Sequence, residues 1–145
     1  MTMFDERYEV VLADTASSRD IYYRLRYRVF CEETGFEDAR RFGNQRERDR
    51  YDDYAVRFPV RGKRRNRWLA AARLVIGPAD FLPVNRVAEI GLDDAPQETI
   101  IAEFSRLLIR NDYRTPTESG EAEPEVLLGL IRAAREYCRS IDIDQ

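Results

Sequence analysis

The chain has 145 residues, enough for one compact domain with a single hydrophobic core. Hydrophobic residues make up 43% and charged residues 35%, which is typical of folded proteins and excludes a disordered one. The net charge of -3 argues against a general nucleic-acid-binding protein, and the lack of histidine removes Ser-His and Cys-His catalysis and most metal sites from consideration.

Two features indicate the compartment. The two cysteines, Cys31 and Cys138, lie in separate amphipathic segments and form no disulfide framework, which predicts a reducing cytoplasm. No stretch approaches eighteen uninterrupted apolar residues, so neither secretion nor a membrane span is predicted.

The first predicted elements are a strand over residues 8–13 and a helix that follows it. Ser17 and Asp20 have the spacing of a capping box, and apolar residues then recur at helical spacing. We expect this helix to run to about Glu33 and to end at Gly35.

The middle of the chain predicts a hairpin and a further strand. Residues 37–53 are strongly charged and form either a long connection or a short helix plus a loop. Alternation then predicts a strand over residues 54–60, and a basic turn joins it to a longer buried strand over residues 68–76. Another apolar strand is predicted over residues 99–110.

A helix beginning near Pro124 has apolar residues at a 3.6-residue period, and residues 141–143 are a candidate for one more strand. There is no internal repeat and no low-complexity segment. This order of elements predicts an α+β fold with a largely antiparallel sheet, which by itself is compatible with many activities.

The segment YRLRYRVFCEETGF, residues 23–36, resembles the opening of acyl-homoserine-lactone synthases and, more closely, of acyltransferases associated with the PEP-CTERM exosortase system. Those families carry an Arg, an aromatic residue four positions later and a second aromatic residue six positions further on. The matching residues here are Arg26, Phe30 and Phe36. The homoserine-lactone enzymes usually have Trp at the position of Phe36.

Three more elements of these families follow in order. A D-x-x-D pair is matched by Asp49 and Asp52, and a buried strand with Arg followed by Leu is matched at Arg73. An E-x-S-R strand is matched by the residues Glu103, Phe104, Ser105 and Arg106. Four elements in the right order are far more specific than any one motif, and the resemblance covers roughly residues 20–140, nearly the whole chain.

The resemblance implies the GNAT acyltransferase fold, in which a mixed, mostly antiparallel sheet is flanked by helices. It also implies transfer of a fatty acyl group from a carrier thioester to a small amine. We expect a single domain over residues 1–145 that lacks the C-terminal strands of the fold, since GNAT domains continue with another strand beyond the position of Gln145.

Acyl transfer needs a base for the ammonium and donors for the oxyanion at the thioester carbonyl. Strand alternation places the predicted base Glu103 and the hydroxyl of Ser105 on one face, with Phe104 and Arg106 on the other. In GNAT proteins this strand is bulged, and we expect the bulge between residues 104 and 107. The alternative for Glu103 is a simple ion pair with an arginine.

The resemblance also implies an acceptor-amine site built from charged and aromatic residues. Its predicted members are Arg26, Phe30, Phe36, Asp49, Asp52, Arg73, Phe104 and Arg106. A purely structural ion network is an equal alternative for Asp49 and Arg73, and the two phenylalanines are expected to be core or pocket wall. One of the tyrosines at positions 22, 23 and 27 could protonate the leaving thiolate, although core packing is their ordinary role.

The donor can be inferred from two loops. Residues 111–123 contain one glycine and four acidic residues, which disfavours the phosphates of CoA. A basic turn suits an acidic acyl-carrier protein instead; its members are Arg61, Lys63, Arg64, Arg65 and Arg67. The alternative is an ordinary solvated turn, and the lack of interleaved aromatic residues disfavours nucleic acid.

The leading hypothesis is thus an N-acyltransferase of the N-acyl amino acid synthase kind, with acyl-carrier protein or acyl-CoA as donor and no bound cofactor. A second hypothesis is a homoserine-lactone synthase for quorum sensing, which would use S-adenosylmethionine. A third is a non-catalytic carrier-binding module. The sequence leaves the oligomeric state, the acyl length and the acceptor open.

Overall fold

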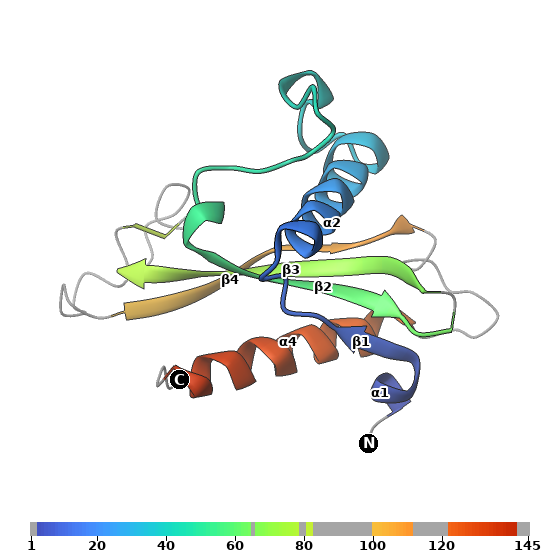
Figure 1. Ribbon diagram of the computed structural model, residues 1–145, viewed down its shortest axis with the longest axis vertical. Helices are drawn as coiled ribbons and strands as arrows, with labels where there is room; N and C mark the ends of the chain where they lie inside the picture. Colours follow the sequence, from blue (N-terminus) through green and yellow to red (C-terminus); the bar gives the residue numbers. More distant parts are fainter. Residues whose placement is uncertain (1–2, 65, 79–80, 83–99, 112–121, 142–145) are drawn as a thin grey trace.

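The computed structural model describes residues 3–64, 66–78, 81–82, 100–111 and 122–141. These residues form a four-stranded antiparallel sheet with helices on both of its faces (Figure 1). Helix α2, Ala16–Arg26, lies on one face and helix α4, Ala122–Ser140, lies on the other. The predicted α+β class and antiparallel sheet are confirmed.

The sheet has the strand order β1-β2-β3-β4, so each strand pairs with its neighbour in the sequence. The strands are β1 (Tyr8–Val10), β2 (Ala55–Gly62), β3 (Arg67–Pro78) and β4 (Ile100–Ile109). The predicted hairpin corresponds to β2 and β3. The first strand is shorter than predicted, although the N–H groups of Val11 and Ala13 still donate to backbone carbonyls of the β2 segment.

Strand β3 is covered on both faces, and for this reason residues 69–75 are all nearly inaccessible to solvent. Ala70, Ala72 and Leu74 pack in the core beneath α4, together with Val126 and Leu130 of that helix. The intervening residue 71 packs with α2 on the opposite face. The exception to this apolar run is residue 73, a buried arginine, and the candidate site is built around it.

Helix α2 begins at a capping box that the sequence analysis placed wrongly. Thr15 is the N-cap, with its Oγ1 accepting from the N–H of Ser18 at 3.1 Å and its own N–H donating to Ser18 Oγ at 3.0 Å. The predicted partners Ser17 and Asp20 form no box, because Thr15 already has extended backbone angles and starts the helix earlier. Asp20 instead forms ion pairs with arginines.

The predicted helix continues to Glu33 but changes its geometry. Residues Tyr27–Glu33 form a π-helix, η1, and the N–H of Thr34 donates to the carbonyl of Val29 at 3.0 Å. Gly35 follows with a φ of 66°, which confirms the predicted stop at this glycine. The wider turn of a π-helix changes which side chains face the sheet, and such turns are frequent at functional sites.

The remaining described elements are short, apart from α4. They are helix α1 (Met3–Arg7) and the 3-10 turns η2 (Ala39–Arg41) and η3 (Asp52–Tyr54). The charged segment 37–53 is thus a long connection with a turn near each end. In α4, Val126, Leu130, Ala134 and Cys138 are buried at helical spacing, as predicted.

The last predicted strand, 141–143, lies largely outside the described residues. None of the helices described here is both long enough and apolar enough to cross a membrane.

Candidate active site

Strand β4 contains the bulge that the sequence predicts. Leu108 pairs with Ala71 of β3 and Ser105 pairs with Arg73, so β4 has one more residue than β3 between these pairs. Arg106 has a φ of 50°, which is uncommon for a residue with a side chain. A bulge disrupts the ladder and leaves backbone groups locally unpaired. Among the described residues β4 is also the edge strand of the sheet, next to β3.

Because of the bulge, the side chain of Arg106 does not point in the predicted direction. Simple alternation puts Arg106 opposite to Ser105, but the extra residue turns both side chains toward the α2 face. Ser105 Oγ accepts a hydrogen bond from Arg73 Nε at 3.2 Å, and Arg106 Nη2 donates to Glu37 Oε1 at 3.1 Å. Arg106 therefore joins the charged groups of the site.

Glu103 lies on the same face, two residues before Ser105. It pairs in register with Val75, whose side chain packs with Ile101 and Tyr51 on the α2 side of the sheet. Glu103 is partly buried and takes part in an interaction within the protein. Phe104 points the other way and packs against the core beneath α4, so it is removed from the face that carries the other predicted site residues.

Arg26 is the centre of a buried ion network on this face. Its side chain is fully buried, with Nη1 2.5 Å from Asp52 Oδ1 and Nε 2.5 Å from Glu47 Oε2. Arg73 is 2% exposed and lies 2.6 Å from Asp49 and 3.4 Å from Asp52. The predicted residues Arg26, Asp49, Asp52 and Arg73 are thus brought together from three separate segments of the chain.

Glu47 is a site residue that the sequence analysis did not single out. It is 1% exposed, and its two oxygens face Arg26 and Arg106, with Oε1 3.6 Å from Arg106 Nη2. Along the charged segment, residues 47, 49 and 51 point inward while residues 48 and 50 are exposed. The two-residue period of RERDRY was the available signal, because an extended segment presents alternate residues to the sheet.

The network shifts the pKa values of its members. Burial raises the pKa of Asp49, but the charge and hydrogen bond of Arg73 outweigh burial and hold the pKa below its ordinary value. Burial lowers the pKa of Arg26, yet Asp52 and Glu47 stabilise the charged form and the pKa stays above its ordinary value. Burial also raises the pKa of Tyr22 to about 12, so its hydroxyl remains protonated at neutral pH.

Tyr22 and Tyr23 contact this network and have little exposed surface. Arg26 Nη1 lies 3.4 Å from Tyr22 Oη, and Tyr23 Oη accepts from Arg57 Nε at 3.0 Å. Both tyrosines are buried, at 0% and 6% exposure. Both side chains are therefore held in the protein interior by packing and hydrogen bonds.

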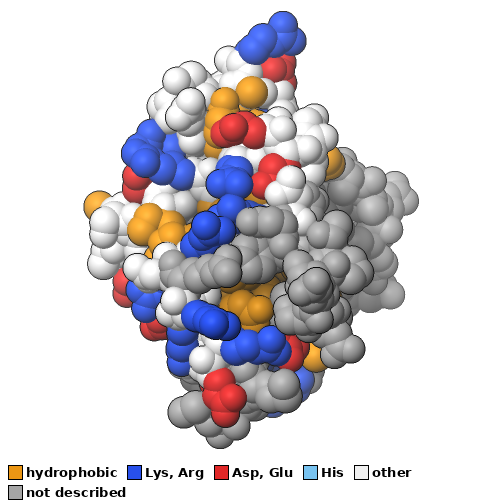
Figure 2. Space-filling model, turned by 90° about the vertical axis from the view of Figure 1, so that its right-hand side faces the viewer, with side chains coloured by type: hydrophobic (Ala, Val, Ile, Leu, Met, Phe, Trp, Pro, Cys, Tyr) orange, Lys and Arg blue, Asp and Glu red, His pale blue; other side chains and the backbone are white. Residues whose placement is uncertain are grey.

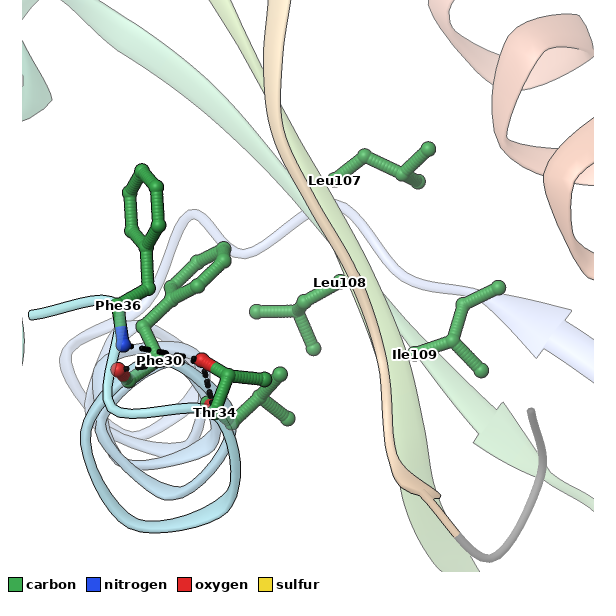
Figure 3. A pocket seen from close by; sticks show the side chains of 7 residues that line it. Phe30, Thr34, Phe36, Leu107, Leu108 and Ile109 are labelled. Carbon is green, nitrogen blue, oxygen red and sulfur yellow. Dashed lines mark hydrogen bonds between the residues drawn. The ribbon is translucent and has the colours of Figure 1, made fainter. Parts of the chain in front are cut away.

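An apolar pocket of about 390 Å³ lies between η1 and β4, beside the bulge (Figure 3). Its lining residues are Val29, Phe30, Thr34, Phe36, Leu107, Leu108 and Ile109. The Arg106 guanidinium lies 5.4 Å from the centre of the Phe30 ring and 5.9 Å from that of Phe36. The pocket and the ion network therefore meet at Arg106, and both predicted phenylalanines form pocket wall.

Residues 25–119, about two thirds of the chain, match the family model described as "Acetyltransferase (GNAT) domain". The chain belongs to the GNAT acetyltransferase family. The match includes every predicted catalytic and acceptor-site residue from Arg26 to Arg106, and it supports acyl transfer as the general activity. No curated protein and no solved structure gives a significant match.

The basic turn of this GNAT domain joins β2 to β3. Lys63, Arg64 and Arg67 are exposed, whereas Arg61 is partly buried and pairs with Glu9. Figure 2 looks toward the end of the sheet where this turn lies, and Lys and Arg side chains are spread over that face. Arg65 and most of the acidic loop 111–123 lie outside the described residues.

Proposed function

We propose that this GNAT domain is an N-acyltransferase that moves a fatty acyl group from a carrier thioester onto the amine of an amino acid or a similar small molecule. Family membership supports acyl transfer, and the observation that carries the proposal is the bulge at Arg106. It lies three residues after Glu103 in the same strand and next to both the ion network and the apolar pocket.

The proposed reaction uses groups on one face of β4. Glu103, acting directly or through a water, takes a proton from the acceptor ammonium. The freed amine attacks the thioester carbonyl carbon, and backbone N–H groups released by the bulge donate to the oxyanion. The C–S bond then breaks, the nitrogen gives up its second proton through solvent to the departing sulfur, and the products are the amide and the free thiol. The ion network holds Arg73, and through it Ser105, in place beside the reacting strand.

The donor that we favour is acyl-carrier protein, although acyl-CoA stays an alternative. Arg64 and Arg67 are exposed, and within the described residues neither forms an ion pair, so both are available to an acidic partner. Arg67 precedes Arg73 by six residues along β3, which corresponds to about 20 Å in a strand. An extended phosphopantetheine arm can span such a distance from the turn to the bulge.

Mass spectrometry of bacteria that express this chain tests the proposed activity. We expect new fatty acyl amides with the wild type and none with Glu103→Gln, while Glu136→Gln, an exposed carboxylate of α4, retains them. The mass of the head group separates an N-acyl amino acid from a homoserine lactone. Absence of any new amide with the wild type would contradict the proposal.

A charge reversal tests the donor. Arg64→Glu with Arg67→Glu should lower kcat/KM for acyl-carrier protein by at least tenfold and leave kcat/KM for acyl-CoA unchanged, since rim charges govern protein encounter. Arg139→Glu, at an exposed position of α4, is the matched control. Equal loss with both donors would assign the turn a structural role instead.

A further inference from the structure

Ser105 lies in β4 between the proposed base and the bulge. It pairs in register with Arg73, and Glu103 pairs with Val75, so the side chains of Ser105 and Glu103 lie on the same face of the sheet. Residues two positions apart in a strand are about 7 Å apart along it. Residues 106 and 107 follow directly and have no register partner in β3. The Ser105 side chain therefore lies next to the backbone proposed to bind the thioester oxygen.

The hydrogen bond that Ser105 forms leaves its hydroxyl hydrogen unused. Arg73 Nε lies 3.2 Å from Ser105 Oγ. An arginine side chain has only donors, so the serine oxygen is the acceptor in this bond. Among the described residues, none accepts the hydroxyl hydrogen of Ser105. The hydroxyl group is thus a donor that lacks an acceptor, on the face that carries Glu103.

Arg73 is itself held in place, which fixes the hydroxyl group that it contacts. Its side chain is 2% exposed, and Nη1 lies 2.6 Å from Asp49 Oδ1 and 3.4 Å from Asp52 Oδ1. These carboxylates balance the charge and hold the guanidinium, whose Nε–H points at Ser105. A hydroxyl that accepts from a cation is polarised and becomes a stronger donor. A donor that is fixed before the reaction needs no reorganisation when charge develops.

We infer that the Ser105 hydroxyl donates a hydrogen bond to the oxyanion and that Arg73 is the positioning residue that orients it. The inference rests on the proposed acyl transfer and adds a side-chain donor to the backbone N–H groups at the bulge. When the amine attacks the carbonyl carbon, the electron pair of the C=O π bond moves to the oxygen. Ser105 O–H donates to that oxygen and keeps its proton. The bond strengthens as negative charge develops, so it stabilises the transition state more than the bound substrate.

Two other roles for this hydroxyl fit the contacts less well. A nucleophilic serine needs a base that takes its proton, but the group bonded to Ser105 Oγ is the Arg73 cation, which accepts no proton. A purely structural serine would use its hydroxyl hydrogen within the protein, and within the described part of the chain that hydrogen has no acceptor. The oxyanion of the reaction supplies this acceptor.

Steady-state kinetics of Ser105 variants test the inference. The assay follows thiol release from decanoyl-acyl-carrier protein, and separately from decanoyl-CoA, with an equimolar mixture of the standard amino acids as acceptors. Ser105→Ala should lower kcat on the order of a hundredfold, as is typical for loss of one oxyanion donor, and change KM for the donor by less than about threefold. Ser140→Ala removes an exposed hydroxyl that donates to Tyr137 O in α4, and this matched control should keep kcat unchanged.

Two variants of similar size separate hydrogen bonding from packing. Ser105→Thr keeps a hydroxyl and should retain kcat within about threefold of the wild type. Ser105→Cys has nearly the size of the wild type but a weak S–H donor, so its kcat should fall about as far as that of Ser105→Ala. Urea unfolding shows whether each variant is folded under the assay conditions.

A double-mutant cycle tests the positioning role of Arg73. Arg73→Lys keeps the charge but has a single ammonium in place of the fork that contacts both Asp49 and Ser105. We expect this variant to lower kcat, and we expect Ser105→Ala to lower it little further in the Arg73→Lys background, because both changes act through the same hydroxyl. Fully additive losses in kcat would contradict the positioning role.

The outcomes distinguish this inference from the proposed function. If the wild type is active and Ser105→Ala or Ser105→Cys keeps its kcat, the inference alone is overturned. An acyl adduct on Ser105, detected by intact-protein mass spectrometry with the donor and no acceptor, would also overturn it, because the serine would then be a nucleophile. If the wild type releases no thiol from either donor, the transferase proposal fails and the inference fails with it. Loss of kcat in the Ala and Cys variants but not in Ser105→Thr supports the inference.

Discussion

Asp52→Asn tests the buried ion network most directly. Asp52 is fully buried, and its Oδ1 lies 2.5 Å from Arg26 Nη1 and 3.4 Å from Arg73 Nη1. Its Oδ2 accepts the N–H of Asp49 at 2.7 Å. An asparagine has nearly the same shape but no charge. In either orientation its amide NH2 group would face a donor, either the Arg26 guanidinium or the N–H of Asp49. The substitution therefore removes a shared counter-charge and at least one hydrogen bond.

The expected cost can be worked from these distances. At an effective dielectric constant of about 20, the two ion pairs correspond to about 7 and 5 kcal/mol of Coulomb attraction. Much of this attraction is offset by the cost of burying the carboxylate, a cost that asparagine avoids. Removal of one partner of a buried pair typically costs about 3–5 kcal/mol, because the other charge stays buried. We expect the free energy of unfolding to fall by that amount.

Urea unfolding followed by the fluorescence of Trp68, the single tryptophan, measures the change. The neighbouring Asp53→Asn is the matched control, since that side chain is 69% exposed and pairs only with Arg48 among the described residues, at 2.9 Å. An exposed pair contributes at most about 1 kcal/mol. If the two variants unfold at the same urea concentration, the argument that the network stabilises the fold is refuted.

Three further predictions concern single sites. The pKa of Asp49 is lowered in the folded protein, so its contribution to stability is complete above the pKa of the unfolded chain, about 3.9, and is lost as the pH falls through the pKa of the folded protein. Between these two pKa values the free energy of unfolding should therefore fall more steeply with decreasing pH in the wild type than in Asp49→Asn, as measured by urea unfolding at each pH. Thr15→Ala should cost about 1 kcal/mol in thermal unfolding through loss of the N-cap, whereas Ser17→Ala should be nearly neutral, and equal effects would contradict the cap assignment. Gly35→Ala should destabilise by about 1 kcal/mol because φ is 66°, whereas Gly43→Ala, at a glycine with no positive φ and an equally open position, should not.

The sequence determined most of the fold because its signals are local. Two-residue alternation located β2, short apolar runs located β3 and β4, and the helical period located α4, so each element could be recognised from its own residues. The start of α2 was missed because Thr15, Ser17 and Ser18 are all acceptable N-caps. Only the backbone angles at Thr15 decide between them.

The site was predictable in its membership more than in its geometry. The family resemblance grouped Arg26, Asp49, Asp52 and Arg73 as charged partners, but their meeting depends on how α2 and the charged connection pack on β3. The same packing decides that Glu47, one acidic residue among many, is buried between Arg26 and Arg106.

What only the tertiary structure decided is the direction of side chains where regular geometry ends. The resemblance to GNAT proteins indicated a bulge in β4, but alternation then gave the wrong face for Arg106, because the extra residue is defined only by the pairing with β3. The pocket beside it likewise depends on the π-helical turn that brings Phe30 opposite Leu108. Such features follow from contacts between distant segments, which a local pattern does not contain.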